Sequence, residues 1–154
     1  MPGVTLGMIT LAPIFRAFSR RRRTVKGCQL AGSLGFNTCV LRSSERHFGY
    51  RRSLHVWLTR YDDANAALLI LLAYIIMGHP DWKEAEIAIF ATFPSASLDA
   101  EVEELQGTIG AGRLPISARN VHALPADNDR ALDELFARHS AEADLVLLGY
   151  SPDL

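Results

Sequence analysis

Two adjacent carboxylates, Asp62 and Asp63, follow an apolar segment. Paired acids in proteins can bind a divalent metal or transfer protons. The two residues also directly precede an apolar helical pattern, where a carboxylate accepts hydrogen bonds from the unpaired N–H groups of a first turn, and we favour this capping role. Ser95 follows the next apolar segment and could act as a nucleophile, but no Gly-x-Ser-x-Gly pattern surrounds it. A small hydrolase that uses Asp62, Asp63 or Ser95 is therefore the third-ranked hypothesis, and we expect no catalytic residue.

The histidines and cysteines lack the spacing of a metal site. No HExxH or HxxxH pattern occurs among the histidines, which are His47, His55, His79, His122 and His139. His55 and His122 fall in predicted strands, where a histidine with a structural role is the common case. Cys28 and Cys39 form no CxxC pair, so they predict neither a metal site nor a disulfide framework, and a reducing compartment is the default. We expect no metal and no cofactor.

The elements that would position these side chains begin at residue 53. Strands alternate with helices from there onwards: strand 53–60, helix 64–77, strand 86–93, a helix capped by Ser97, strand 120–124, a helix capped by Asp127, and strand 143–148. This β-α-β-α-β-α-β order with apolar strands predicts an α/β fold in three layers, a parallel sheet between helices. Trp57 and Trp82 are expected in the core, each with its indole N–H paired.

The composition agrees with one soluble domain. The chain has 154 residues, of which 49% are hydrophobic and 21% charged, and this balance argues against a disordered or collagen-like protein. No segment approaches the roughly 20 apolar residues of a membrane-spanning helix.

Charge divides the chain into two parts. Residues 1–52 hold ten basic and one acidic side chain, a net charge of +9, whereas residues 53–154 hold six basic and sixteen acidic ones, a net charge of −10. We interpret residues 1–33 as a basic, poorly ordered tail, residues 34–52 as the remaining strand of a preceding lobe with a connecting loop, and residues 53–154 as one complete α/β lobe. The glycines near residue 30 make no phosphate-binding loop. The tail could also flank a membrane segment or form a basic arm, but no nucleic-acid partner is expected.

Several segments together resemble the C-terminal cytosolic domain of the cation–chloride cotransporters, a family within the amino acid/polyamine/organocation superfamily. The resemblance rests on Leu54-His55-Val56-Trp57-Leu58, Asp62-Asp63, Leu68 to Tyr74, Trp82, Ile87-Ala88-Ile89-Phe90 and Ala143 to Gly149. Upstream, Leu34 to Leu41 looks like the strand that closes the first lobe of that domain. Both lobes of the family are similar to universal stress proteins. Ala88 replaces the family's usual Arg, and Phe36 replaces a Pro.

The resemblance implies a non-catalytic regulatory or interaction domain of a Na-K-Cl-type cotransporter. The ion-translocating domain is missing from the sequence, so a truncated or separately encoded form is expected, at the cytoplasmic face of the cell membrane or free in the cytoplasm. Its expected partner is a membrane transporter subunit or a second copy of the chain. The alternative is a free-standing universal-stress-like protein that binds ATP or AMP, although no glycine-rich loop and helix follow Leu148.

Overall fold

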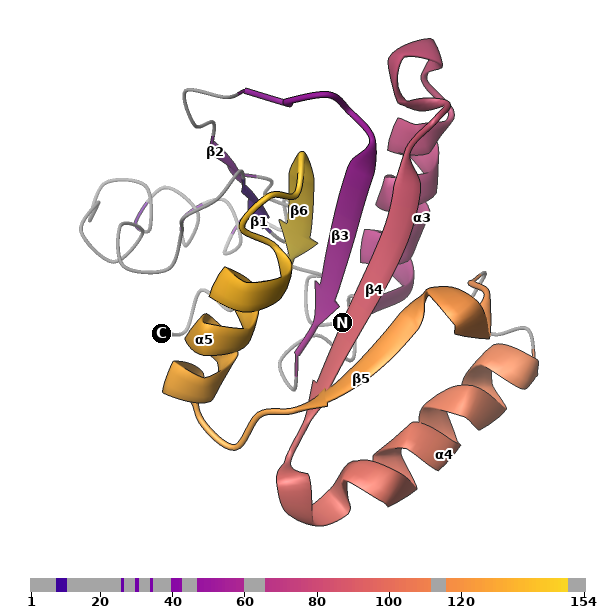
Figure 1. Cartoon of the computed structure of the whole chain (residues 1–154), viewed down its shortest axis with the longest axis vertical. Helices are drawn as coiled ribbons and strands as arrows, with labels where there is room; N and C mark the ends of the chain where they lie inside the picture. The colour runs from indigo at the N-terminus through magenta and orange to yellow at the C-terminus, as the bar shows by residue number, and fades with distance from the viewer. Residues whose placement is uncertain are drawn as a thin grey trace.

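The computed structural model describes residues 8–10, 26, 30, 34, 40–42, 47–59, 66–111 and 116–149. The strands among these residues form one six-stranded sheet in the order β2-β1-β6-β3-β4-β5 (Figure 1). The strands are β1 Met8–Thr10, β2 Val40–Arg42, β3 Ser53–Leu58, β4 Glu86–Phe93, β5 Val121–Pro125 and β6 Leu145–Leu148. Neighbours run parallel from β6 through β3 and β4 to β5, whereas β1 runs antiparallel to β6 and parallel to β2.

Each crossover between the parallel strands contains one helix. The helices are α3 Ala66–Met77, α4 Leu98–Gly110 and α5 Asp129–His139, and single 3₁₀ turns lie at η1 Pro80–Trp82, η2 Ser95–Ser97 and η3 Ala118–Asn120. The expected α/β fold, with four parallel strands flanked by helices, is confirmed.

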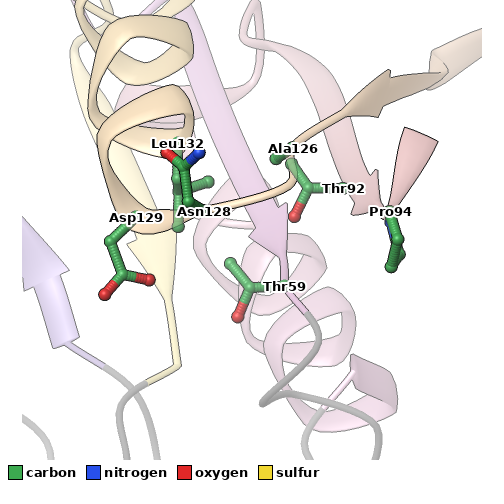
Figure 2. Close-up of a pocket in the computed structure, with 7 residues that line it drawn as sticks. All are labelled: Thr59, Thr92, Pro94, Ala126, Asn128, Asp129 and Leu132. Atoms are coloured by element: carbon green, nitrogen blue, oxygen red, sulfur yellow. The ribbon is translucent and has the colours of Figure 1, made fainter. Parts of the chain in front are cut away.

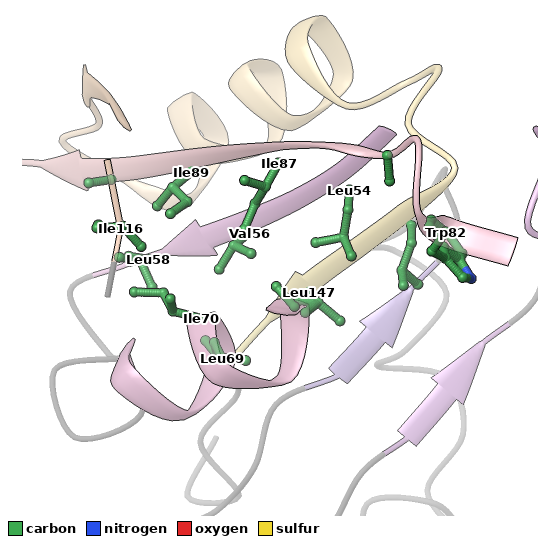
Figure 3. Close-up of a cluster of buried hydrophobic side chains, with 14 residues drawn as sticks. Leu54, Val56, Leu58, Leu69, Ile70, Trp82, Ile87, Ile89, Ile116 and Leu147 are labelled. Atoms are coloured by element: carbon green, nitrogen blue, oxygen red, sulfur yellow. The ribbon is translucent and has the colours of Figure 1, made fainter. Parts of the chain in front are cut away.

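One face of the sheet is covered by α3 and α4. Leu54 and Val56 of β3 are fully buried on this face, and Ile70 of α3 packs into the same cluster (Figure 3). The half-buried Leu105 and Ile109 of α4 join the edge of this cluster. Alternate β3 residues point to the same face of a strand, so the apolar side chains of β3 supply this layer at every second position.

The opposite face is covered by α5. Trp57 is fully buried there, between the rings of Phe90 from β4 and Phe136 from α5, at centroid distances of 4.7 and 4.1 Å. Leu132 of α5 and Val146 of β6 complete this cluster. The central strand β3 is thus buried on both faces, as its nearly continuous apolar sequence predicts for a parallel sheet.

The element boundaries follow the sequence closely in this lobe. Strand 86–93 matches β4, while the first, third and last predicted strands are observed at Ser53–Leu58, Val121–Pro125 and Leu145–Leu148. α3 ends where expected, because the N–H of Gly78 bonds to the carbonyl of Tyr74 and Pro80 follows. The strand expected within residues 34–41 overlaps β2 at Val40 and Leu41, and residues 35–39 lie outside the described residues.

One predicted helix cap is confirmed in position only, and another is wrong. Ser97 occupies the N-cap position of α4, but its side chain makes no capping hydrogen bond; η2 runs directly into the helix there, and the Ser97 N–H bonds to the carbonyl of Pro94. Asp127 does not cap α5. The cap is Asn128, which has extended backbone angles and whose side chain accepts a 2.9 Å hydrogen bond from the N–H of Ala131.

Candidate functional site

The carboxyl ends of β3, β4 and β5 meet at one edge of the sheet, the usual ligand position in parallel α/β folds. A small hollow lies there, at the start of α5, lined by Thr59, Thr92, Pro94, Ala126, Asn128, Asp129 and Leu132 (Figure 2). Both threonines are buried, and the hydroxyl of Thr92 donates to the carbonyl of Leu58 at 3.4 Å. The hollow offers about 20 Å³ of space, which is room for one or two water molecules.

Ser95 and Asp127 contact each other beside this hollow. The hydroxyl and the backbone N–H of Ser95 each donate to the carboxylate of Asp127 at 2.7 Å. The hydroxyl bond, with the backbone bond second, holds the pKa of Asp127 below its ordinary value. A carboxylate with a lowered pKa is a weak base for activating a hydroxyl nucleophile. The pair is therefore suited to joining the loops after β4 and β5 rather than to nucleophilic chemistry.

The other residues singled out from the sequence do not converge on this edge. Asp62, Asp63, Cys28 and Cys39 lie outside the described residues. His79 precedes η1, and its Nδ1 accepts a 3.2 Å hydrogen bond from the N–H of Asp81. Among the residues that are described, no three histidine, cysteine or acidic side chains gather closely enough to hold a metal ion.

A buried hydrogen-bond chain crosses the α5 face of the sheet. The indole N–H of Trp57 donates to Oγ of Ser140 at 2.9 Å, and the same oxygen lies 2.8 Å from Nδ1 of His55. Ser140 is only 1% exposed, so no substrate reaches its hydroxyl. These contacts confirm the expected structural role of His55 and the paired indole of Trp57.

A second polar contact that the sequence did not reveal joins β6 to the loop before β3. The carboxylate of Asp144, in a buried residue, accepts hydrogen bonds from the backbone N–H groups of Tyr50 at 3.0 Å, Arg52 at 2.8 Å and Ser53 at 3.1 Å. Burial raises the pKa of this carboxyl, but the bonds from Arg52, Tyr50 and Ser53 outweigh burial and hold the pKa below its ordinary value.

The geometry of this loop explains why its N–H groups converge. His47, Gly49 and Arg51 have positive φ angles of 50°, 50° and 56°, alternating with their neighbours. Alternation of left-handed and other residues turns successive N–H groups to one side and forms an anion-binding concavity. The sequence signal for this contact was an acidic residue directly before a wholly apolar strand.

The outer side of α3 carries an exposed apolar surface. Leu71 is 51% exposed, Tyr74 37% and Ile75 63%, and their i, i+3, i+4 spacing places them on one side of the helix. We call these three residues the α3 surface. None of the twelve residues of α3 is charged. Within the parts of the chain that the structure describes, no helix is long and apolar enough to cross a membrane.

The sequence matches no protein-family model and no curated protein. What the site can do is therefore argued from its residues.

Proposed function

We propose that this chain is a non-catalytic regulatory and interaction domain that binds its partner through the α3 surface. The proposal agrees with the resemblance to the cytosolic domain of the cation–chloride cotransporters, which would place the chain at the cytoplasmic face of a membrane beside a transporter subunit. The observation that carries it is the exposure of Leu71, Tyr74 and Ile75 on a helix without a charge.

The energetics favour burial of the α3 surface in a complex. Fully burying one large aliphatic or aromatic side chain is worth about 1.5–3 kcal/mol, so three partly exposed side chains leave several kcal/mol ungained in the isolated chain. Contiguous exposed apolar residues are a common mark of interaction sites.

A second copy of the chain is the partner that this surface fits best. Two copies of α3 would meet without burying any charge, because the helix has none to desolvate. A two-fold interface of this kind needs only one self-complementary patch. The transporter subunit is then the partner to test if the chain does not pair with itself.

The polar groups at the carboxyl edge support a non-catalytic role. Ser95 and Asp127 bond to each other, Thr92 bonds to the backbone, and Asn128 caps α5. Each of these side chains already serves the fold.

Sedimentation velocity of the full chain tests the proposal. We expect a dimer with a dissociation constant in about the micromolar range. The double variant Leu71→Glu, Ile75→Glu should weaken it at least about tenfold, because two carboxylates would have to be desolvated. The matched control, Gln106→Glu with Ala137→Glu, adds the same charges at exposed positions of α4 and α5 and should leave the dimer intact.

A monomer at all concentrations would rule out the second copy. Binding to a reconstituted cation–chloride cotransporter that lacks its own cytosolic domain, lost in the double variant and kept in the control, would then support the transporter partner. Absence of both kinds of binding would overturn the interaction proposal.

One other candidate is the binding of ATP or AMP at the start of α5, outside the hollow, which has room only for one or two water molecules. The first turn of α5 presents backbone N–H groups beside this hollow, and helix N-termini attract phosphate. Asp127 and Asp129 oppose it with negative charge at the same place. Calorimetric titration of the full chain with ATP and with AMP decides this candidate, and heat of binding that Asn128→Ala weakens would support it.

A further inference from the structure

Three histidines surround one aromatic ring on the α5 face. The rings of His55 from β3, His122 from β5 and His139 from α5 lie 5.2, 5.2 and 5.3 Å from the ring of Phe90. We call these three residues the histidine cluster. They come from three different elements, so a change in their charge acts on the packing of α5 against the sheet.

The hydrogen-bond chain from Trp57 to His55 suits a neutral His55. The indole of Trp57 can only donate, so Oγ of Ser140 is the acceptor of that bond. The Ser140 hydroxyl then has its own proton to give, and Nδ1 of His55 at 2.8 Å is placed to accept it. One neutral tautomer satisfies both groups: His55 carries its proton on Nε2 and accepts the Ser140 hydroxyl proton at Nδ1.

A proton added to Nδ1 of His55 would reverse the hydrogen bond between His55 and Ser140. Nδ1 would become a donor facing Oγ of Ser140, and the hydroxyl proton would lose its acceptor in a residue that is only 1% exposed. A buried polar group left without its partner destabilises the state that contains it. The C-terminal turn of α5, which Ser140 follows as its C-cap, would therefore be the first part to separate from the sheet.

Two of the three titratable groups that act on His55 lower its pKa, and one raises it. Burial is the largest effect, and with His139 and His122 it lowers the pKa of His55 to about 4, while Asp144, just before β6, opposes them. The paired positions on the neighbouring strands, Ala88 of β4 and Val146 of β6, carry no charge.

We propose that Trp57, Ser140 and His55 form an acid-sensitive latch, which holds the C-terminal end of α5 on the sheet at neutral pH and releases it in mildly acidic solution. The latch lies on the face opposite the α3 surface and does not depend on the interaction function. It gives the molecule one face that responds to pH and one that does not.

Hydrogen exchange of the full chain at pH 7 and pH 5 tests the latch. After correction for intrinsic exchange rates, we expect the amides of residues 133–140 to gain about twentyfold in opening at pH 5 and to stay less protected than the amides of α3 at both pH values. His55→Gln, which does not titrate, should abolish the gain. The matched control His79→Gln changes a histidine outside the cluster and should keep it.

The nitrogen shifts of the histidine rings give a reading that needs no variant. In the native chain at pH 7, long-range proton–nitrogen spectra should show His55 protonated on Nε2 alone. A proton on Nδ1 would overturn the proposal. So would a full acid response in His55→Gln, or equal protection of residues 133–140 and α3 at both pH values, which would mean that both open only by global unfolding.

Discussion

The two faces of the sheet bury side chains of different chemistry. The α3 face is filled by aliphatic residues such as Leu54, Val56 and Ile70, and its helix carries no titratable group except the hydroxyl of Tyr74. The α5 face is built around the stacked rings of Trp57, Phe90 and Phe136, with the histidine cluster at its margin. One central strand, β3, contributes to both. The aliphatic packing of the α3 face does not respond to pH. The packing of the α5 face depends on keeping the half-buried His55 neutral.

The largest expected effect comes from removing the central ring of the α5 face. Trp57→Ala should lower the free energy of unfolding by about 3–5 kcal/mol at pH 7, because a cavity forms and Ser140 loses its donor. Leu69→Ala, its counterpart on the α3 face, should cost about 2–5 kcal/mol. Urea denaturation at pH 7 and pH 5 sharpens the contrast: the cost at Leu69 should stay the same, and the cost at Trp57 should shrink at pH 5. Equal behaviour of the two would remove the distinction between the faces.

The next largest loss of stability is expected from removing the carboxylate of Asp144, which joins β6 to the loop before β3. Asp144→Ala leaves the N–H groups of Tyr50, Arg52 and Ser53 without their acceptor and should cost about 2–3 kcal/mol at pH 7. Because the folded pKa lies below the ordinary value, this stabilisation is present above about pH 4 and is lost as pH falls through the lowered pKa. Asp144→Asn, which keeps one carbonyl acceptor, should cost less. Urea midpoints that did not separate the two variants would show that the bonds to the loop add little.

Acid should lower the free energy of unfolding of the wild-type chain before the carboxylates titrate. The folded pKa of His55, about 4, lies below its ordinary value of 6.5, so the unfolded state binds a proton that the native state refuses. Stability is therefore full above pH 6.5 and falls as pH decreases towards 4, by up to about 2 kcal/mol at pH 5. Thermal unfolding of wild type and His55→Gln between pH 7 and pH 5 measures the difference, and parallel curves would argue against the assignment.

The smallest expected effect on stability is a difference between the caps of α5 and α4. Asn128→Ala removes the side-chain cap of α5 and should cost about 1 kcal/mol. Ser97→Ala at the start of α4 removes no side-chain hydrogen bond and should leave the urea midpoint unchanged. A cost at Ser97 as large as that at Asn128 would mean that α4 starts differently from the arrangement described.

Local patterns predicted the lobe from residue 53 because each signal lies within a short stretch of chain. An eight-residue apolar run ended by Pro94 is enough to define β4, and the apolar run stopped by Gly78 is enough to define α3. The choice between Asp127 and Asn128 as a cap failed because Ser95, 32 residues away, binds the aspartate.

Contacts between distant segments could not be predicted in this way. Asp144 meets Tyr50 across 94 residues, and His55 meets Ser140 across 85, so no spacing rule connects them. The α3 surface was hidden for another reason: an apolar helix predicts burial, and only the assembled sheet shows which side of it stays uncovered.

The position of β6 has a consequence for how the chain is made. Of the described strands, β6 is the last in sequence, yet it lies between β1 and β3 in the middle of the sheet. During synthesis, β3 therefore keeps an open hydrogen-bonding edge until residue 148 has left the ribosome, and the rings that Val146 and Leu148 will cover stay uncovered. Such an edge is a template for pairing with another nascent chain. Slow emergence of β6 thus prolongs the period in which the open edge of β3 can pair with another nascent chain.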